Sequence, residues 1–201
     1  LSYSVQGLGN VGSYFSLVAE KNHPKWQFVG ATDSSGGIYK KKGALKAHEV
    51  ADFKKARGRL IDYQANSVQP IKNDELIGNQ VTVLVLAALG DAITINNWMT
   101  IKSKFIVELA NGPVSDQAYA KLTDAGVIVV PDILANAGGV IVSYLEWLQN
   151  INGTKWTENQ VNEKLEEYLT KATDNIFFTS KRLNITLKDA AFVVAIERLI
   201  K

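Results

Sequence analysis

Short apolar runs alternate with amphipathic stretches over the first two thirds of the chain. Runs with the composition of strands lie at residues 3–5, 26–33, 81–88, 104–110 and 126–132. The run VTVLVLAA at 81–88 is apolar except for Thr82, which is typical of a parallel strand buried on both faces. Residues 10–22 carry an apolar stripe at helical spacing, and 115–126 is a further predicted helix. This alternation predicts a parallel sheet built from βαβ units.

The pattern changes after residue 150. Residues 157–177 open with a capping box from Thr157 to Gln160 and continue with apolar positions at helical spacing. A second helix is predicted over 186–200, beginning at Thr186. We therefore expect one domain over 1–201, with an α/β core over 1–150 and a helical extension over 151–201.

Composition narrows the class of protein. The 201 residues are 46% hydrophobic, enough for one good core, and the net charge of +2 is unlike that of a nucleic-acid-binding protein. The absence of cysteine excludes disulfides, thiolate catalysis and Cys-ligated metals. His23 and His48 are far apart in polar surroundings, so we expect no metal site. No apolar run reaches the length of a membrane span, and no signal-peptide pattern is seen, so we expect a cytoplasmic protein that binds neither membrane nor nucleic acid.

The segment from Lys40 to Arg59 has a local excess of positive charge. Its eight Lys and Arg residues stand against Glu49 and Asp52, a net charge of +6. One interpretation is an ordinary solvated loop and helix face, and the other is an anion site, for example for a cofactor phosphate. Nucleic-acid binding here would require steeply salt-dependent affinity.

A glycine motif follows the first predicted strand. Gly7, Gly9 and Gly12 fit G-x-G-x-x-G, in which the first glycine permits a tight turn and the second allows a pyrophosphate to approach the backbone. The third permits close helix–strand packing, and the helix N-terminus attracts the phosphates. Asp33 ends the second strand 21 residues after Gly12, where an acidic residue binds the adenosine ribose hydroxyls. Asp33 favours NAD over NADP, although residues 40–42 could meet a 2′-phosphate if their loop folded back; a plain turn residue is the alternative interpretation of Asp33.

Two further segments follow predicted strands, where a doubly wound sheet exposes its ligand-binding edge. ELANGPVSD contains Asn111, and PDILANAGGVIVSYLEWLQN contains Asn136. An Asn side chain could hydrogen-bond a carboxamide with both its donor and its acceptor. Turn chemistry followed by a helix start explains the same residues equally well. No Lys, His or Asp lies in a motif suited to proton transfer, so we expect no catalytic residue in this chain.

These segments together resemble a known family. VQGLGNVGSY, ATDSSGGIY, VELANGPVSDQA and VVPDILANAGGVIVSYLEWLQN resemble the glutamate, leucine, phenylalanine and valine dehydrogenases in their C-terminal, NAD(P)-binding domain. The last of these, followed by WTENQVNEKLEEYL, is most similar to glutamate dehydrogenase. The resemblance covers nearly the whole chain in order, and residues 40–80 are the least similar part. It implies an α/β fold: a Rossmann-type, doubly wound, mainly parallel sheet with helices on both faces and a C-terminal helical extension.

The resemblance also implies functions. The complete enzyme would oxidatively deaminate L-glutamate to 2-oxoglutarate and ammonium by hydride transfer, with NAD as cofactor and NADP as a possibility. The N-terminal substrate domain, which carries the catalytic residues and the contacts of a homo-oligomer (a hexamer in this family), would be absent from this chain, so the chain alone would be inactive. Val140 and Ser143 would bind substrate, and they lie on one face of a helix because they are three residues apart. The implied cofactor-binding residues are Gly7, Gly9, Asn10, Val11, Gly12, Asp33, Ser34, Ala88, Asn111 and Asn136.

The chain departs from the family pattern in places. Where the family usually reads PAALEN, this sequence has Leu86, Gly90 and Asp91, and an acidic side chain beside phosphates would weaken cofactor binding. Leu109 replaces a usual glycine and Val114 a threonine. An alternative function is therefore a divergent, non-catalytic domain that binds a nucleotide or a partner for regulation.

Overall fold

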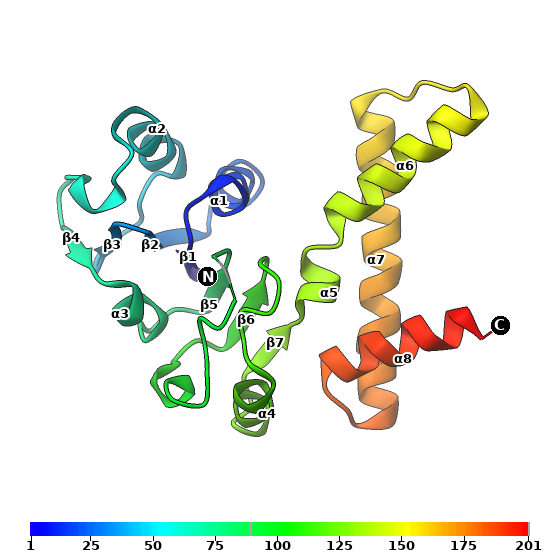
Figure 1. The fold of residues 1–201 in the computed structure, drawn as a ribbon. Coiled ribbons are helices and arrows are strands. Elements are labelled where there is room, and N and C mark those ends of the chain that lie inside the picture. The colour runs from blue at the N-terminus through cyan, green and yellow to red at the C-terminus, as the bar shows by residue number, and fades with distance from the viewer. Residues whose placement is uncertain (89, 201) are drawn as a thin grey trace. The chain divides into compact units, whose positions relative to one another are not determined.

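A computed structural model describes residues 1–88 and 90–200 of the chain (Figure 1). By their contacts these residues group into two compact units, Leu1–Val129 and Val130–Lys201. The sequence placed the end of the α/β core later, at residue 150. The strands are β1 (Ser2–Gln6), β2 (Gln27–Asp33), β3 (Gly36–Lys40), β4 (Val68–Ile71), β5 (Val83–Leu86), β6 (Phe105–Glu108) and β7 (Ile128–Val130). The helices are α1 (Asn10–Asn22), α2 (Ala47–Arg57), α3 (Asn73–Ile77), α4 (Asp116–Asp124), α5 (Asp132–Ala135), α6 (Gly138–Asn152), α7 (Glu158–Leu183) and α8 (Leu187–Leu199), with 3-10 turns η1 (Leu60–Asp62) and η2 (Trp98–Thr100).

The described strands form one sheet in the order β4-β3-β2-β1-β5-β6-β7. Strands β2, β1, β5 and β6 are parallel neighbours, and β3 and β4 add to the β2 edge in antiparallel orientation. The parallel orientation is therefore confirmed for the strands predicted at 3–5, 26–33, 81–88 and 104–110, and the run predicted at 126–132 forms β7 at the edge of the sheet. Strands β3 and β4 were not predicted, because β3 is a short run beginning with two glycines and β4 contains a proline, compositions that are unfavourable for a strand.

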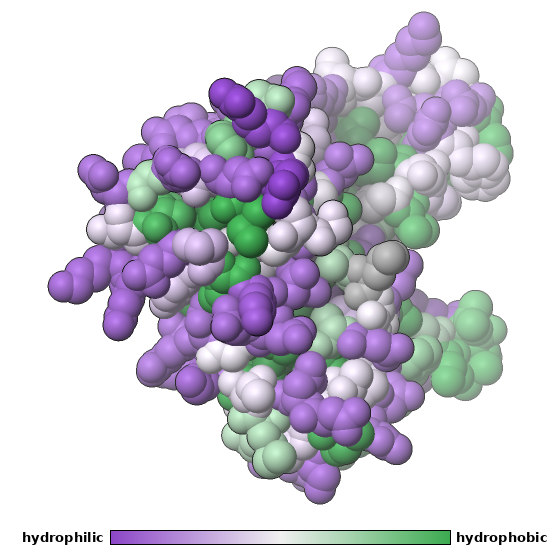
Figure 2. All heavy atoms as spheres, turned by 60° about the vertical axis from the view of Figure 1, so that its left-hand side comes forward, coloured by the Kyte–Doolittle hydropathy of each residue, from purple (hydrophilic) through white to green (hydrophobic). Residues whose placement is uncertain are grey.

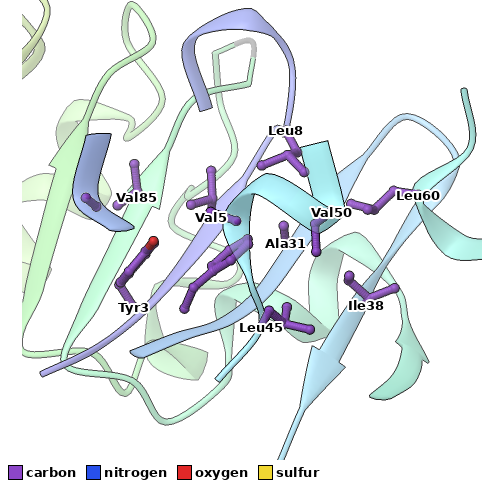
Figure 3. Packing of buried hydrophobic residues seen from close by; sticks show 12 residues of the cluster. Tyr3, Val5, Leu8, Ala31, Ile38, Leu45, Val50, Leu60 and Val85 are labelled. Carbon is purple, nitrogen blue, oxygen red and sulfur yellow. The ribbon is translucent and has the colours of Figure 1, made fainter. Parts of the chain in front are cut away.

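Helices cover both faces of this sheet. On one face Val5, Ala31 and Val85 are completely buried, and they belong to a cluster that includes Ala19 of α1 and Val50 of α2 (Figure 3). The opposite face is covered by α3 and α4, which contribute to a second cluster; its strand residues are Val29, Leu84, Leu86, Ile106 and Val129. Burial on both faces explains why 81–88 is apolar at every position except Thr82, which hydrogen-bonds with Ser2. The Rossmann-type α/β class is confirmed.

The second unit is helical. The Thr157 hydroxyl accepts from the Gln160 N–H and the Gln160 side chain accepts from the Thr157 N–H, which confirms the predicted capping box at the start of α7. Thr186 caps α8 by accepting from the Asp189 N–H. A small cluster joins α5, α7 and α8; its buried members are Leu134, Ile176, Ala190, Ala191 and Val194.

Figure 2 draws all heavy atoms of the chain. On the face drawn there, hydrophilic side chains predominate, with hydrophobic residues in smaller patches between them.

Candidate functional site

The glycine loop joins β1 to α1 at the carboxyl edge of the sheet. The N–H groups of Gly7 and Leu8 both donate to the Thr32 carbonyl at the end of β2, at 3.0 and 2.7 Å. Gly7 has a φ of +95°, a conformation that glycine adopts readily and other residues rarely. A Cβ at Gly7 would lie only 2.5 Å from the Ala88 backbone nitrogen, so the loop is pressed against the segment that follows β5.

Gly9 and Gly12 have opposite surroundings. A Cβ at Gly12 would overlap the Gly7 carbonyl oxygen and approach the Val5 side chain, because α1 crosses β1 closely at this point. A Cβ at Gly9 would meet no atom within 4 Å. Gly9 is the N-cap of α1 and is exposed, so its backbone borders open space at the positive end of a 13-residue helix. This arrangement fits the pyrophosphate of a dinucleotide, because the first N–H groups of a helix have no intrahelical acceptor.

The segments after β5 and β6 lie beside one another at the same edge. The N–H groups of Leu109 and Ala110 both donate to the Leu86 carbonyl at 2.9 Å, and the Asp91 N–H donates to the Gly112 carbonyl at 3.1 Å. An isolated parallel bridge between Ile93 and Val114 continues this pairing. The structure therefore brings Ala88 and Asn111 to the edge that carries the glycine loop, as the sequence predicted for residues after parallel strands.

The departures from the family pattern have different structural roles. Leu86 and Val114 are buried in the second core cluster, and Leu109 packs against the first. Asp91 is exposed and has a φ of +60°, a left-handed conformation that Asn and Asp tolerate better than most residues. Its effect on cofactor affinity stays a prediction. Residue 89 of the same segment lies outside the described residues.

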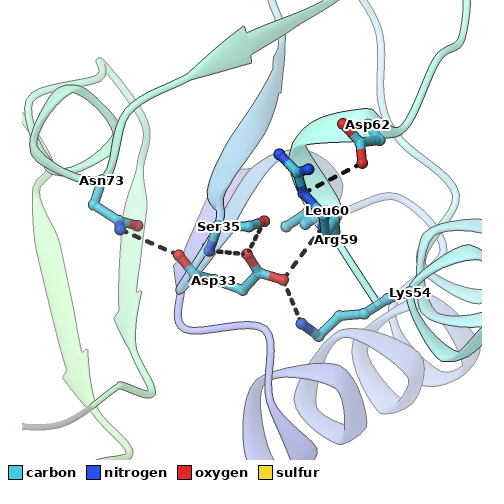
Figure 4. Close-up of polar contacts among 7 residues, drawn as sticks. All are labelled: Asp33, Ser35, Lys54, Arg59, Leu60, Asp62 and Asn73. Carbon is cyan, nitrogen blue, oxygen red and sulfur yellow. Dashed lines mark hydrogen bonds and ion pairs between the residues drawn. The ribbon is translucent and has the colours of Figure 1, made fainter. Parts of the chain in front are cut away.

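Asp33 ends β2 and lies at the centre of a polar cluster (Figure 4). Its Oδ1 accepts from the Ser35 N–H at 2.8 Å and from the Ser35 hydroxyl at 2.6 Å. Its Oδ2 accepts from the Lys54 ammonium and, at 3.4 Å, from the Leu60 N–H. The Asp33 side chain is only 7% exposed. Burial by itself would raise the pKa of the Asp33 carboxyl, but the hydrogen bonds from Lys54 and Ser35 outweigh it and hold that pKa below its ordinary value.

Lys54 is a residue that the sequence did not single out. It lies on α2, within the basic segment at 40–59, and its side chain is 23% exposed. The only sequence signal was its membership of that segment, and no spacing rule links it to Asp33, 21 residues earlier. Ser34, which was predicted, is exposed beside Asp33 in the turn between β2 and β3.

A second polar contact fixes the start of α2. Glu20 of α1 accepts from the N–H groups of Ala47 and His48, at 2.9 and 3.2 Å, and lies 2.7 Å from the His48 ring nitrogen Nδ1. This carboxylate completes the first turn of α2, which has no side-chain cap of its own. Hydrogen bonding to Glu20 raises the pKa of His48. Burial would raise the pKa of Glu20, but its bonds with His48 and Ala47 lower it overall.

The remaining predicted residues belong to the second unit. Asn136 ends the short helix α5, and Val140 and Ser143 lie in α6. Val140 is 75% exposed and Ser143 is also exposed. Their one-face spacing on a helix is as the sequence predicted.

Over residues 1–88 and 90–200, no group of three or more His, Cys, Asp or Glu is placed to hold a metal ion. No helix of the described residues is long and apolar enough to cross a membrane.

Comparison with known proteins decides the family. The family described as Glutamate/Leucine/Phenylalanine/Valine dehydrogenase matches residues 2–201. The chain belongs to this family. It is 39% identical over 196 residues to a glutamate dehydrogenase of Thermotoga maritima, covering 98% of this chain and 46% of that protein. It is 42% identical over 198 residues to glutamate dehydrogenase A2 of Halobacterium salinarum, and this match covers 97% of this chain and 46% of that protein.

Solved structures agree with the sequence comparison. The Leu-bound form of a hetero-hexameric glutamate dehydrogenase from Thermus thermophilus superposes with a TM-score of 0.89 at 32% identity, covering 98% of this chain and 45% of that one. The resemblance inferred from the sequence motifs is confirmed. The chain spans about half the length of the glutamate dehydrogenases it matches. Family membership implies a nicotinamide dinucleotide as cofactor.

Proposed function

We propose that this chain is the NAD(P)-binding domain of a glutamate dehydrogenase. The observation that carries the proposal is the glycine loop, where Gly7 and Gly12 are sterically required and Gly9 borders open space. The relatives from Thermotoga maritima and Halobacterium salinarum, each similar along nearly the whole chain, are glutamate dehydrogenases, which favours glutamate as the substrate over the other amino acids of the family.

The residues of the first unit would hold the cofactor. The N–H groups at Gly9, Asn10, Val11 and Gly12 would bind the pyrophosphate, and Asp33 with Ser34 would bind the adenosine ribose. Ala88 and Asn111 would border the nicotinamide half. When bound, the nicotinamide ring accepts or returns the hydride of the reaction. Because an acidic residue at the end of this strand is the usual acceptor of the adenosine ribose hydroxyls, and Asp33 ends β2, we propose NAD as a cofactor.

Three residues of the second unit also have proposed roles. Asn136 would hydrogen-bond the carboxamide of the nicotinamide with its own amide. Val140 and Ser143, on one face of α6, would contact the amino acid, with Ser143 toward the far carboxylate of glutamate. The role of this chain is then to orient the cofactor toward the substrate, and the proton-transfer groups would come from outside it.

Isothermal titration of the chain with NAD and with NADP tests this function. We expect heat of binding for at least one cofactor, and no binding of either at millimolar concentration would contradict the proposal. We also expect no glutamate oxidation by the 201-residue chain alone, and measurable turnover would show that it carries its own catalytic groups. In the complete enzyme we propose a homo-oligomer, a hexamer as in this family, which sedimentation of the full-length protein would test.

A regulatory, non-catalytic nucleotide-binding domain is the alternative that one observation favours. Asp91 places a negative charge in the segment after β5, and its N–H bonds to Gly112 at the same edge. Under this alternative the full-length protein would bind a nucleotide but would not oxidise glutamate at any cofactor concentration.

A further inference from the structure

The dipeptide Asn-Gly occurs twice in the sequence, at Asn111–Gly112 and at Asn152–Gly153. This dipeptide is chemically labile, because the backbone nitrogen of the glycine can attack the carboxamide carbon of the asparagine side chain. Glycine favours the attack, since it has no side chain to hinder the approach and its backbone turns easily. Both copies share this chemistry, so a difference in their reactivity must come from the structure around them.

Asn111–Gly112 lies outside the helices and strands. The segment follows β6 and forms a bend in which both residues are exposed. A Cβ at Gly112 would meet no atom within 4 Å, so the space beside this glycine is open. The Gly112 carbonyl accepts from the Asp91 N–H at 3.1 Å, but that bond holds the peptide group after Gly112, and the attacking nitrogen belongs to the peptide group before it. This copy has the exposure and the irregular backbone that the reaction needs.

Asn152–Gly153 is also exposed, but Asn152 is the last residue of α6. The Gly153 N–H donates to the Asn150 carbonyl at 3.4 Å, and the Thr154 N–H closes the helix end by donating to the Gln149 carbonyl at 2.9 Å. Helical backbone geometry fixes the Gly153 nitrogen relative to the Asn152 side chain, so ring closure would require this last turn to open.

We propose that Asn111–Gly112 is a site of spontaneous deamidation and that the reaction weakens cofactor binding; the second part rests on the proposed dinucleotide-binding function. The Gly112 nitrogen forms a bond to Cγ of Asn111, the bond from Cγ to Nδ2 breaks, and the proton of the attacking nitrogen leaves with Nδ2 as ammonia. Water then opens the resulting succinimide ring at one of its two carbonyl carbons. One product is aspartate, and the other is isoaspartate, in which the main chain runs through Cβ.

Either product changes the carboxyl edge of the sheet. The Asn111 amide, which would border the nicotinamide half of the cofactor, becomes a carboxylate, and a carboxylate at neutral pH has no donor. Asp91 lies in the neighbouring segment, with its N–H bonded to the Gly112 carbonyl, so a second negative charge is added close to the first and to the cofactor phosphates. Isoaspartate also adds a carbon atom to the main chain before Gly112, which shifts the carbonyl that Asp91 binds.

Incubation of the chain at pH 8, followed by proteolysis and mass spectrometry of the two Asn-Gly peptides, tests the site. We expect Asn111 to deamidate at least about tenfold faster than Asn152, because the Asn152 backbone must first be released from the helix. The reaction should be slower at pH 6, since the Gly112 nitrogen attacks after losing its proton. Saturating cofactor should slow it at Asn111 and not at Asn152. Deamidation of Asn152 as fast as that of Asn111 would overturn the assignment.

Asn111→Asp measures the effect on cofactor binding directly. We expect its affinity for the cofactor to fall about tenfold, the value of a lost hydrogen bond with an added like charge. Asn152→Asp is the matched control, because it adds the same charge at an exposed position and should change the affinity little. The incubated chain should lose affinity in proportion to the fraction of Asn111 converted.

Two outcomes separate the parts of the proposal. Unchanged affinity in Asn111→Asp would overturn the link between deamidation and cofactor binding. Failure of the fresh, unaltered chain to bind either cofactor would instead refute the proposed function, and the deamidation of Asn111 read by mass spectrometry does not depend on that function.

Discussion

The glycine loop and the Asp33 cluster form two ends of the proposed cofactor site, and they are built by different forces. The loop depends on backbone shape: positive φ at Gly7 and space too small for a side chain at Gly12. The cluster depends on charge: a buried carboxylate satisfied by Lys54 and Ser35. Steric overlap does not depend on pH, whereas a contact between charged groups does. Substitutions at the glycine loop should therefore act at every pH, and substitutions at the Asp33 cluster should act in a pH-dependent way.

Gly12→Ala, at the glycine loop, has the largest expected effect. The added methyl group would overlap the Gly7 carbonyl, and this backbone group cannot yield without moving α1 away from β1. We expect a loss of stability of about 3 kcal/mol, at the upper end of overpacking effects, measured by urea unfolding. A variant as stable as the original chain would show that the loop is not sterically fixed.

Asp33→Asn tests how much the Asp33 cluster contributes to the stability of the fold. Because the folded-state pKa of Asp33 is lowered, its contribution is present above its ordinary pKa and is lost as the pH falls through the folded value. We expect the variant to be less stable at pH 7 by about 1 to 2 kcal/mol, with the difference vanishing in acid. Asp62→Asn is the control, because its pair with Arg59 is exposed and should contribute little. A difference that persisted unchanged at low pH would argue against the ion pair.

Gly9→Ala separates binding from folding at the glycine loop. Open space around Gly9 and its ordinary φ of −85° should let the variant fold with unchanged stability. The methyl group would occupy space proposed for the pyrophosphate, so cofactor affinity should fall about tenfold, or about 1.4 kcal/mol, by titration. Gly78→Ala is the matched control, because its Cβ would make only ordinary contacts, and it should leave the cofactor affinity unchanged. Unchanged affinity in Gly9→Ala would place the phosphates elsewhere.

Asp91→Asn tests the departure from the family pattern. The left-handed conformation at this position suits Asn at least as well as Asp, so the fold should be retained. Loss of the negative charge beside the phosphates should raise cofactor affinity by a few fold, about 0.5 to 1 kcal/mol. The exposed Asp124 at the end of α4 provides a control substitution to Asn. A lower affinity in Asp91→Asn would mean that the carboxylate itself contacts the cofactor.

The smallest expected effect is at the start of α2, which positions Lys54. The raised pKa of His48 means that its bond to Glu20 stabilises the fold below the ordinary His pKa and is lost as the pH rises through the raised value. Because His48 is exposed, His48→Gln should lower the unfolding midpoint only slightly at pH 6 and not at pH 9. His23→Gln, which loses a ring contact with Trp26 but no bond to Glu20, is the control. An equal pH dependence of stability in both variants would show that the bond between His48 and Glu20 is not its cause.

Much of the proposed site could be read from local sequence. The spacing of Gly7, Gly9 and Gly12 after a strand is a local pattern, and the close approach of Gly12 to Gly7 and Val5 involves only nearby residues, which is why the geometry of the loop agrees with the prediction. The contact of Gly7 with Ala88 is long-range and came from the structure. The same holds for the capping box at Thr157. Lys54 could not be found this way, because its contact with Asp33 depends on how α2 folds back over β2.

The sequence by itself determined the α/β class, the parallel central strands, the glycine loop and the family, since these follow from apolar periodicity and short-range backbone sterics. Only the tertiary structure decided the antiparallel strands β3 and β4, the grouping into two units and the contacts of Asp33. Strand β3 follows β2 after a two-residue turn, but its glycine-rich start gives no apolar pattern that would predict a strand. Lys54 lies 21 residues after Asp33 on another element, so no local pattern predicts this ion pair, which depends on the packing of α2.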